Sequence, residues 1–159
     1  MFKPLMILAA LLVLLLSACD ENRVFEENMD FEESQWLADS VASFEFEISD
    51  SDQAYNIYWN VRNSLNYPYR NLYLTYYLED TLGNRIATDL HNMLLFDPKT
   101  GEPYGSGFGD IFSHQIMALP DYRFDTAGIY RIRLEQYMRT DTLQEVLSVG
   151  VRVEEAERP

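Results

Sequence analysis

The chain has 159 residues, and its 26 acidic against 12 basic side chains give a formal net charge of −14 at pH 7. This length suits one domain with an apolar core, and the acidity argues against nucleic acid as a partner and against binding to anionic lipid head groups. The only cysteine is Cys19, so we expect neither disulfides nor thiolate metal sites to hold the fold.

The first 18 residues have the pattern of a secretory signal peptide. Lys3 supplies positive charge, and residues 4–16 form an uncharged apolar run that is shorter than the roughly 20 residues of a transmembrane helix. The run ends in the pattern of a bacterial lipobox, made of Leu16, Ser17, Ala18 and Cys19. We expect cleavage before Cys19 and acyl chains on its thiol, which hold the mature chain to a membrane. The alternative is an ordinary secreted protein whose leader happens to end in cysteine.

An acidic segment, residues 19–39, follows the predicted anchor. Its like charges keep the first residues solvated and extended. Apolar side chains such as Phe25, Phe31 and Trp36 predict that the later residues pack along the domain, as an edge strand or a laid-down segment. The folded domain is then residues 40–159.

Alternating apolar and polar side chains predict strands in this domain. The period of two is clearest in residues 44–48, 55–61 and 72–78, and it returns in residues 130–134 and 146–153. In residues 124–130, an aspartate, a glycine and Tyr130 resemble the tyrosine corner of immunoglobulin-like sandwiches. The pattern predicts an all-β fold, an antiparallel β-sandwich of seven to eight strands, immunoglobulin-like or jelly-roll-like.

Three segments allow two interpretations. Residues 85–96 fit a strand or a helix, and the surrounding strands favour a strand. Asp50 and Asp52 suit a turn better than a calcium loop, because the glycine and distal glutamate of such a loop are missing. The glycine-rich residues 104–110 suit a tight loop or bulge better than a phosphate cradle, because their spacing is not that of a P-loop.

Few residues point to catalysis. His91 and His114 are far apart in sequence, and we expect surface or edge positions for them rather than metal ligation. The sequence lacks a Gly-x-Ser-x-Gly elbow and, after the anchor, a free thiol. A carboxylate pair that hydrolyses glycosides is neither excluded nor supported. We therefore predict a protein that is not an enzyme and holds no metal or cofactor.

The tyrosines suggest a binding surface. If Leu72 and Leu74 face the core, Tyr73 and Tyr77 point outward, and we expect them near Tyr58 on the preceding strand. Such a platform suits sugar stacking or a protein partner. The alternative is that a second layer covers these rings.

Several segments of the chain resemble the GldH family of gliding-motility lipoproteins of Bacteroidota. Besides the lipobox leader, they are Val61-Arg62-Asn63, Tyr67-Pro68-Tyr69, Asn71-Leu72, the loop from Gly105 to Asp110 with Ile111, Ala127-Gly128-Ile129-Tyr130, Leu134-Glu135-Gln136-Tyr137-Met138-Arg139 and Val149-Gly150-Val151-Arg152. The most specific is the segment 134–139. The chain departs from the family pattern at Tyr104, where a tryptophan is expected.

The resemblance implies an envelope lipoprotein that supports gliding over surfaces alongside the type IX secretion and motility machinery. It brings no catalytic residues, so we expect a non-catalytic scaffold or assembly factor, anchored in the outer membrane through acyl chains and facing the periplasm. Components of that machinery are the expected protein partners. The alternative function is glycan binding by a lipid-anchored β-sandwich.

Overall fold

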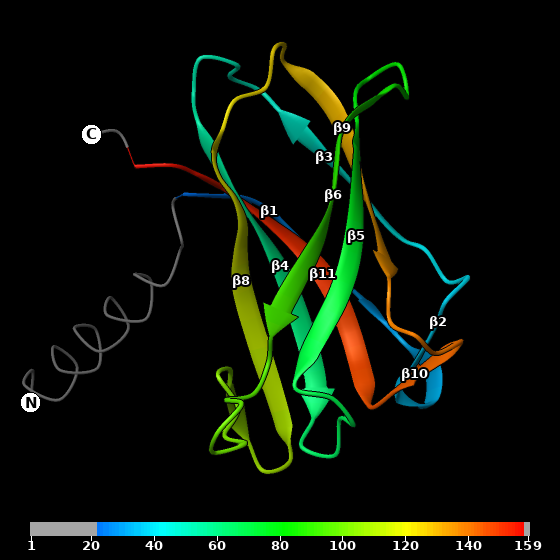
Figure 1. Cartoon of the computed structure of the whole chain (residues 1–159). Helices are drawn as coiled ribbons and strands as arrows, with labels where there is room; N and C mark the ends of the chain where they lie inside the picture. Colours follow the sequence, from blue (N-terminus) through cyan, green and yellow to red (C-terminus); the bar gives the residue numbers. More distant parts are fainter. Residues whose placement is uncertain (1–21, 158–159) are drawn as a thin grey trace, which may run out of the picture.

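Two antiparallel sheets face each other in the computed structural model, which describes residues 22–157 (Figure 1). The strands are β1 (Arg23–Asp30), β2 (Gln35–Leu37), β3 (Ala42–Ile48), β4 (Tyr55–Ser64), β5 (Asn71–Glu79), β6 (Arg85–Leu94), β7 (Ser106–Phe108), β8 (Ile111–Tyr122), β9 (Gly128–Gln136), β10 (Thr142–Gln144) and β11 (Val146–Glu155). A single 3-10 turn, η1 (Glu32–Ser34), separates β1 from β2.

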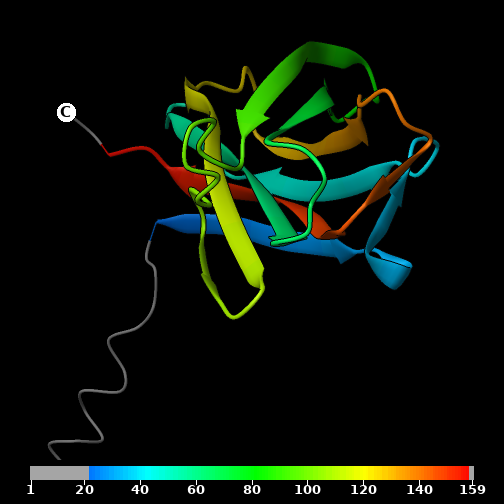
Figure 2. The same cartoon turned by 60° about the horizontal axis from the view of Figure 1, so that its bottom comes forward.

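The strand order is that of a jelly roll. One sheet has the order β1-β11-β4-β8-β7 and the other β3-β9-β5-β6, while β10 and β2 form a separate pair. Figure 2 shows the two sheets as stacked layers. Without the short strands β2, β7 and β10, eight long strands remain, and every connection between them crosses from one sheet to the other except the β5–β6 hairpin, as in two Greek keys. The predicted all-β antiparallel sandwich is confirmed, but the described residues form eleven strands, more than the seven or eight predicted.

The predicted period of two places the core. In β3, β4 and β5, every second side chain is buried between the sheets. These apolar side chains are Phe44, Phe46, Ile48, Tyr55, Ile57, Trp59, Val61, Leu72, Leu74, Tyr76 and Leu78. Val149, Val151 and Val153 of β11 lie opposite them in the same core. Burial of this apolar surface drives the two sheets together.

The tyrosine corner is present at the start of β9. The hydroxyl of Tyr130 donates a hydrogen bond to the carbonyl oxygen of Thr126 at 2.7 Å. The Tyr130 ring lies 4.5 Å from the ring of Phe124, between centroids. This contact joins the turn before β9 to the core.

The ambiguous segments form the structures that the sequence favoured. Residues 85–94 are strand β6, at the edge of the four-stranded sheet. The glycine-rich loop contains β7, which pairs with β8, and a Cβ atom at Gly107 would overlap the carbonyl oxygen of Ile111. Glycine is therefore required there by a close backbone approach.

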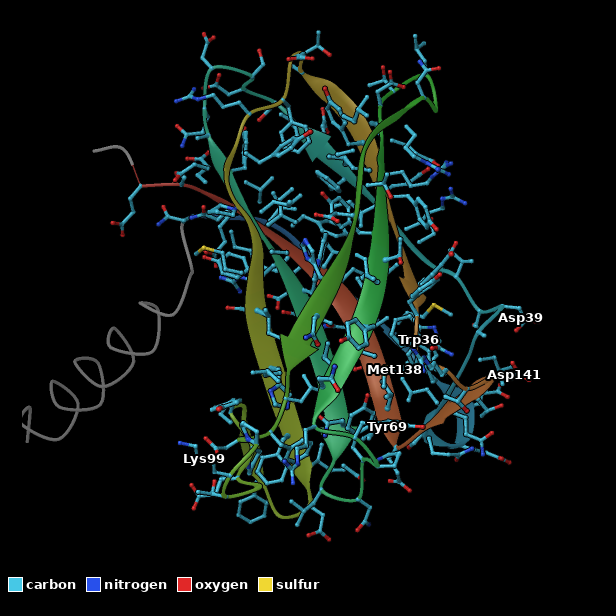
Figure 3. The ribbon with its side chains drawn as sticks, viewed as in Figure 1. Trp36, Asp39, Tyr69, Lys99, Met138 and Asp141 are labelled. Carbon is cyan, nitrogen blue, oxygen red and sulfur yellow. The ribbon has the colours of Figure 1, made fainter. Side chains whose placement is uncertain are left out.

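Part of the acidic segment belongs to the sandwich. Strand β1 pairs with β11 at the edge of the five-stranded sheet. Beyond it, β2 pairs with β10 around the buried Trp36, which is labelled in Figure 3. The Trp36 ring stacks on Phe31 with centroids 5.0 Å apart, and its indole N–H donates to the Ser40 carbonyl at 2.8 Å. These contacts close one end of the sandwich.

Candidate functional site

The predicted lipid anchor lies outside the described residues. Leu16, Ser17, Ala18 and Cys19 precede residue 22, where the description begins. Within residues 22–157 we find no helix with the length and apolar character that crossing a membrane requires.

The three predicted surface tyrosines do not lie together. Tyr58 is on β4 in the five-stranded sheet, whereas Tyr73 and Tyr77 are on β5 in the four-stranded sheet. All three point away from the core, so Tyr58 faces the opposite side of the molecule from the other two. The expected three-tyrosine platform is therefore wrong. The physical reason is that residues 65–70 carry the chain from one sheet to the other instead of forming a hairpin.

Tyr77 is enclosed by charged side chains. The guanidinium carbons of Arg85 and Arg133, from the two neighbouring strands, lie 4.4 and 5.1 Å from the centre of its ring. Its hydroxyl donates to the Glu135 carboxylate at 3.2 Å. Burial and the Glu135 charge raise the pKa of Tyr77. The ring is thus a structural contact of this face more than a platform for stacking.

Tyr73 belongs to an exposed apolar patch on the four-stranded sheet. Tyr73 is 38% exposed, and the backbone N–H of Tyr137 donates to its carbonyl at 2.8 Å. Tyr137 is 66% exposed and Leu90, on the adjacent β6, is 44% exposed. We call Tyr73, Leu90 and Tyr137 the β5 patch. Exposed apolar groups that gather in this way are typical of interaction surfaces.

The histidines differ in burial. His91 lies on the edge strand β6 and accepts a hydrogen bond at Nδ1 from the Trp59 indole at 2.9 Å. His114, on β8, is buried, so its predicted surface or edge position is wrong. The Phe96 ring packs beside it, and its Nε2 has no hydrogen-bond partner among the described residues. Burial lowers the pKa of both histidines. Burial of His114 follows from the loop after β6, which closes over β8.

The aspartates after β3 form a turn. The Asp50 carboxylate accepts the backbone N–H of Asp52 at 2.9 Å, and the Asp50 carbonyl accepts the Tyr55 hydroxyl at 2.8 Å. Such side-chain to backbone bonds are what aspartate supplies in turns. Within residues 22–157, histidine and carboxylate side chains do not gather in groups of three or more that could hold a metal ion.

A groove of about 800 Å³ crosses the outer face of the five-stranded sheet. Its floor comes from β1, β11, β4 and β8, and its far wall includes Leu94 and Tyr104. We call it the sheet groove. Polar side chains line it, including Asn28, Asn60, Arg62, Ser113, Gln115 and Ser148. The sequence offers no sign of this groove, because Asn60 and Arg62 are ordinary outward residues of β4 and the side chains beside them come from distant parts of the chain.

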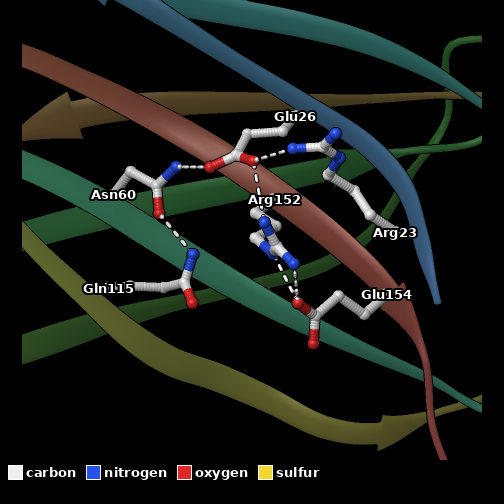
Figure 4. A network of polar contacts seen from close by, with 6 residues as sticks. All are labelled: Arg23, Glu26, Asn60, Gln115, Arg152 and Glu154. Atoms are coloured by element: carbon white, nitrogen blue, oxygen red, sulfur yellow. Dashed lines mark hydrogen bonds and ion pairs between the residues drawn. The ribbon is translucent and has the colours of Figure 1, made fainter. Parts of the chain in front are cut away.

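A polar network borders the sheet groove (Figure 4). The Glu26 carboxylate accepts hydrogen bonds from Asn60 at 2.9 Å, Arg23 at 3.1 Å and Arg152 at 2.8 Å. Burial raises the pKa of Glu26, but these three donors outweigh burial and leave it below its usual value. Arg152 also pairs with Glu154. The network therefore holds Glu26 ionised and fixes the Asn60 amide.

Comparisons with known proteins agree over nearly the whole chain. The model of a family described as GldH lipoprotein matches residues 23–153. The chain is 32% identical over 152 residues to the gliding motility lipoprotein GldH homolog of Christiangramia forsetii, with 91% of each chain covered. It is also 32% identical over 153 residues to the gliding motility lipoprotein GldH of Flavobacterium johnsoniae, with 91% of this chain and 92% of that protein covered.

Similarity to solved structures is weaker. A structure of the infectious bursal disease virus Gx strain aligns with 84% of this chain and 32% of the viral chain, at 13% identity and a TM-score of 0.42. The sequence matches are much stronger, since the family model covers residues 23–153 and each relative aligns with 91% of this chain. This chain belongs to the GldH lipoprotein family.

Proposed function

We propose that this protein is a lipid-anchored envelope lipoprotein that supports gliding motility as a non-catalytic scaffold or assembly factor. The signal peptide, residues 1–18, is removed, and acyl chains on Cys19 hold the protein in the outer membrane, facing the periplasm. Family membership and the names of two relatives that are 32% identical support the motility role. The partners are components of the type IX secretion and motility machinery.

The β5 patch is the observation that carries the scaffold role. It offers two exposed tyrosines and a leucine on one sheet face, and aromatic side chains of this kind are enriched at protein interfaces. Its two tyrosines are held next to each other, because the backbone N–H of Tyr137 donates to the Tyr73 carbonyl at 2.8 Å. A rigid aromatic surface binds a partner at low entropic cost. Residues 20–22, with the acidic Asp20 and Glu21, link the anchored Cys19 to β1.

Affinity purification of the tagged, lipidated protein from its native envelope tests this proposal. Motility or secretion components should copurify with the wild type and be lost from the Tyr73→Ala/Tyr137→Ala variant. Met117→Ala is the matched control, since Met117 is an exposed apolar residue on the opposite sheet. If the wild type and both variants captured the same components, the partner would bind outside the β5 patch. If none of them captured such components, the scaffold role would be contradicted.

A further inference from the structure

The sheet groove has a row of carboxamides across its floor. Pairing of β1, β11, β4 and β8 aligns Asn28 with Gly150, Gly150 with Asn60, and Asn60 with Gln115. Adjacent strands lie about 4.8 Å apart, so Asn60 and Gln115 stand at that spacing, whereas Asn28 is two strands away from Asn60. Gly150 has no side chain, and the Asn28 side chain lies over it where a Cβ atom would be, so the Asn28 amide extends toward Asn60.

The network beside the groove orients these amides. Asn60 donates through its Nδ2 to Glu26 at 2.9 Å and accepts through its Oδ1 from Gln115 at 3.5 Å. These bonds leave the carboxamide oxygen of Gln115 without a partner among the described residues. The side chains of Asn28 and Ser113 also make no hydrogen bond to another described residue. The floor therefore presents an oriented acceptor at Gln115, besides the unused polar groups of Asn28 and Ser113, and the fixed Gln115 amide reduces the entropic cost of binding a polar ligand.

The charges in the groove select for a neutral ligand. Asp30 and Arg62 stand in one row across the sheet, on either side of Ser148. Neither forms an ion pair with another residue of the described part. An anionic ligand would meet Asp30 and Glu26, and a cationic one would meet Arg62. A hydroxyl group is both donor and acceptor, so a hydroxyl-rich ligand can satisfy both side chains.

The wall of the groove adds a ring for stacking. Tyr104 is 57% exposed, and its hydroxyl is held by the Asp97 carboxylate at 3.0 Å. A fixed aromatic ring suits the apolar face of a sugar. A protein partner would instead need several apolar anchors that become fully buried, and the groove offers few besides Leu94.

We propose that the sheet groove binds a neutral glycan chain. The amide row and Ser113 would hydrogen-bond its hydroxyl groups, Arg62 and Asp30 would bind the hydroxyl groups nearest to them, and Tyr104 would stack on one sugar. The site lies on the sheet opposite the β5 patch, so it is separate from the scaffold role. The glycan chain comes from either the N-acetylhexosamine backbone of the cell wall or a hexose polysaccharide of the cell surface.

Calorimetric titration of the full lipidated chain in detergent tests the site. The probes are chitohexaose for the cell-wall backbone, cellohexaose and mannohexaose for hexose polysaccharides, and oligogalacturonate as an acidic glycan. We expect one neutral oligosaccharide to bind with a Kd below about 1 mM and oligogalacturonate to bind at least about ten-fold more weakly. Chitohexaose alone would identify the cell wall as the source, and a hexose oligomer alone the cell surface.

Two groove variants and one control make the test specific. Gln115→Ala and Arg62→Ala change exposed side chains, so both should fold, and each should weaken binding about ten-fold. Tyr73→Ala, on the other sheet, should bind like the wild type. The proposal is overturned if no neutral oligosaccharide binds, if the acidic one binds best, or if both groove variants bind like the wild type. If no protein partner binds the β5 patch while glycan binding is intact, only the scaffold proposal fails.

Discussion

The hydroxyl of Tyr130 joins the turn before β9 to the core. Removing this hydroxyl shows how much its hydrogen bond to Thr126 contributes to stability. Tyr130 is buried, so Tyr130→Phe leaves the Thr126 carbonyl without its 2.7 Å donor. We expect the free energy of unfolding to fall by about 1 to 2 kcal/mol in urea titrations. Tyr137→Phe, with an exposed hydroxyl, should leave it unchanged. Equal stability of wild type and Tyr130→Phe would contradict a stabilising role for the corner.

His114 makes stability depend on pH. Burial lowers its pKa in the folded state below the value of 6.5 that it has when unfolded. As the pH falls, the unfolded chain therefore binds a proton at His114 before the folded chain does. The stability that neutral His114 contributes is present above about pH 6.5 and is lost as the pH falls below it. We expect the urea concentration at the midpoint of unfolding to decrease as the pH is lowered from 7.5 to 5.5. In His114→Gln the fall should be smaller, though His91 titrates in the same direction. A fall of the same size in the variant would contradict this role.

No pattern in the sequence predicts the burial of His114, because its neighbours Ser113 and Gln115 are polar. The burial comes from the loop after β6, where Gly105 approaches the imidazole so closely that a Cβ atom would overlap it. Tyr130 was predictable, because a tyrosine corner is a local pattern. Residues whose environment is set by distant loops were not.

At the scale of elements, Gly150 controls how β1 docks on β11. A Cβ atom at this position would overlap Oδ1 of Asn28 and the carbonyl oxygen of Glu27. The amide can rotate away, but the Glu27 backbone can move only with β1. We expect Gly150→Ala to destabilise the protein by about 1 to 3 kcal/mol and to speed amide hydrogen exchange in β1 more than in β9. Ser148→Ala on the same strand is the control, and unchanged exchange in β1 would show that the strand accommodates the methyl group.

Strands with one buried and one solvent-exposed face were the elements that the sequence predicts. β3, β5 and β4 as far as Asn63 alternate between buried and more exposed side chains, and the sequence shows this directly. β8 was not predicted, because its apolar residues lie on both faces and Pro120 interrupts it. β6 looked partly helical, because most of its side chains are exposed on an edge strand and so carry no strict alternation.

At the scale of the whole molecule, the binding surfaces were the least predictable feature. Outward positions of Tyr58 and Tyr73 followed from alternation, but the crossing of residues 65–70 between sheets puts them on opposite faces. The sheet groove joins side chains that lie up to 122 positions apart, from Glu26 to Ser148. Each is an ordinary outward polar residue of its strand, so only the strand order reveals the groove.

The anchor determines where the whole molecule acts. In Cys19→Ala the thiol that we propose as the lipid attachment site is absent, so the proposed acyl chains cannot hold the protein. We expect the variant to leave the membrane fraction or to be mislocalised, whereas Ser17→Ala, which keeps a small residue before the cleavage site, should remain there. Cys19→Ala protein that still fractionates as an integral lipoprotein would disprove the anchor.

We propose that the four-stranded sheet presents the surface that binds the protein partner. Site-specific photocrosslinking in the native envelope tests this directly. A benzophenone amino acid replaces Tyr137 in the β5 patch or Met117 on the opposite sheet, both of which are more than half exposed. We predict a discrete protein adduct from position 137 that contains a motility or secretion component, and none from position 117. No protein adduct from position 137, or the same adduct from both positions, would contradict the account.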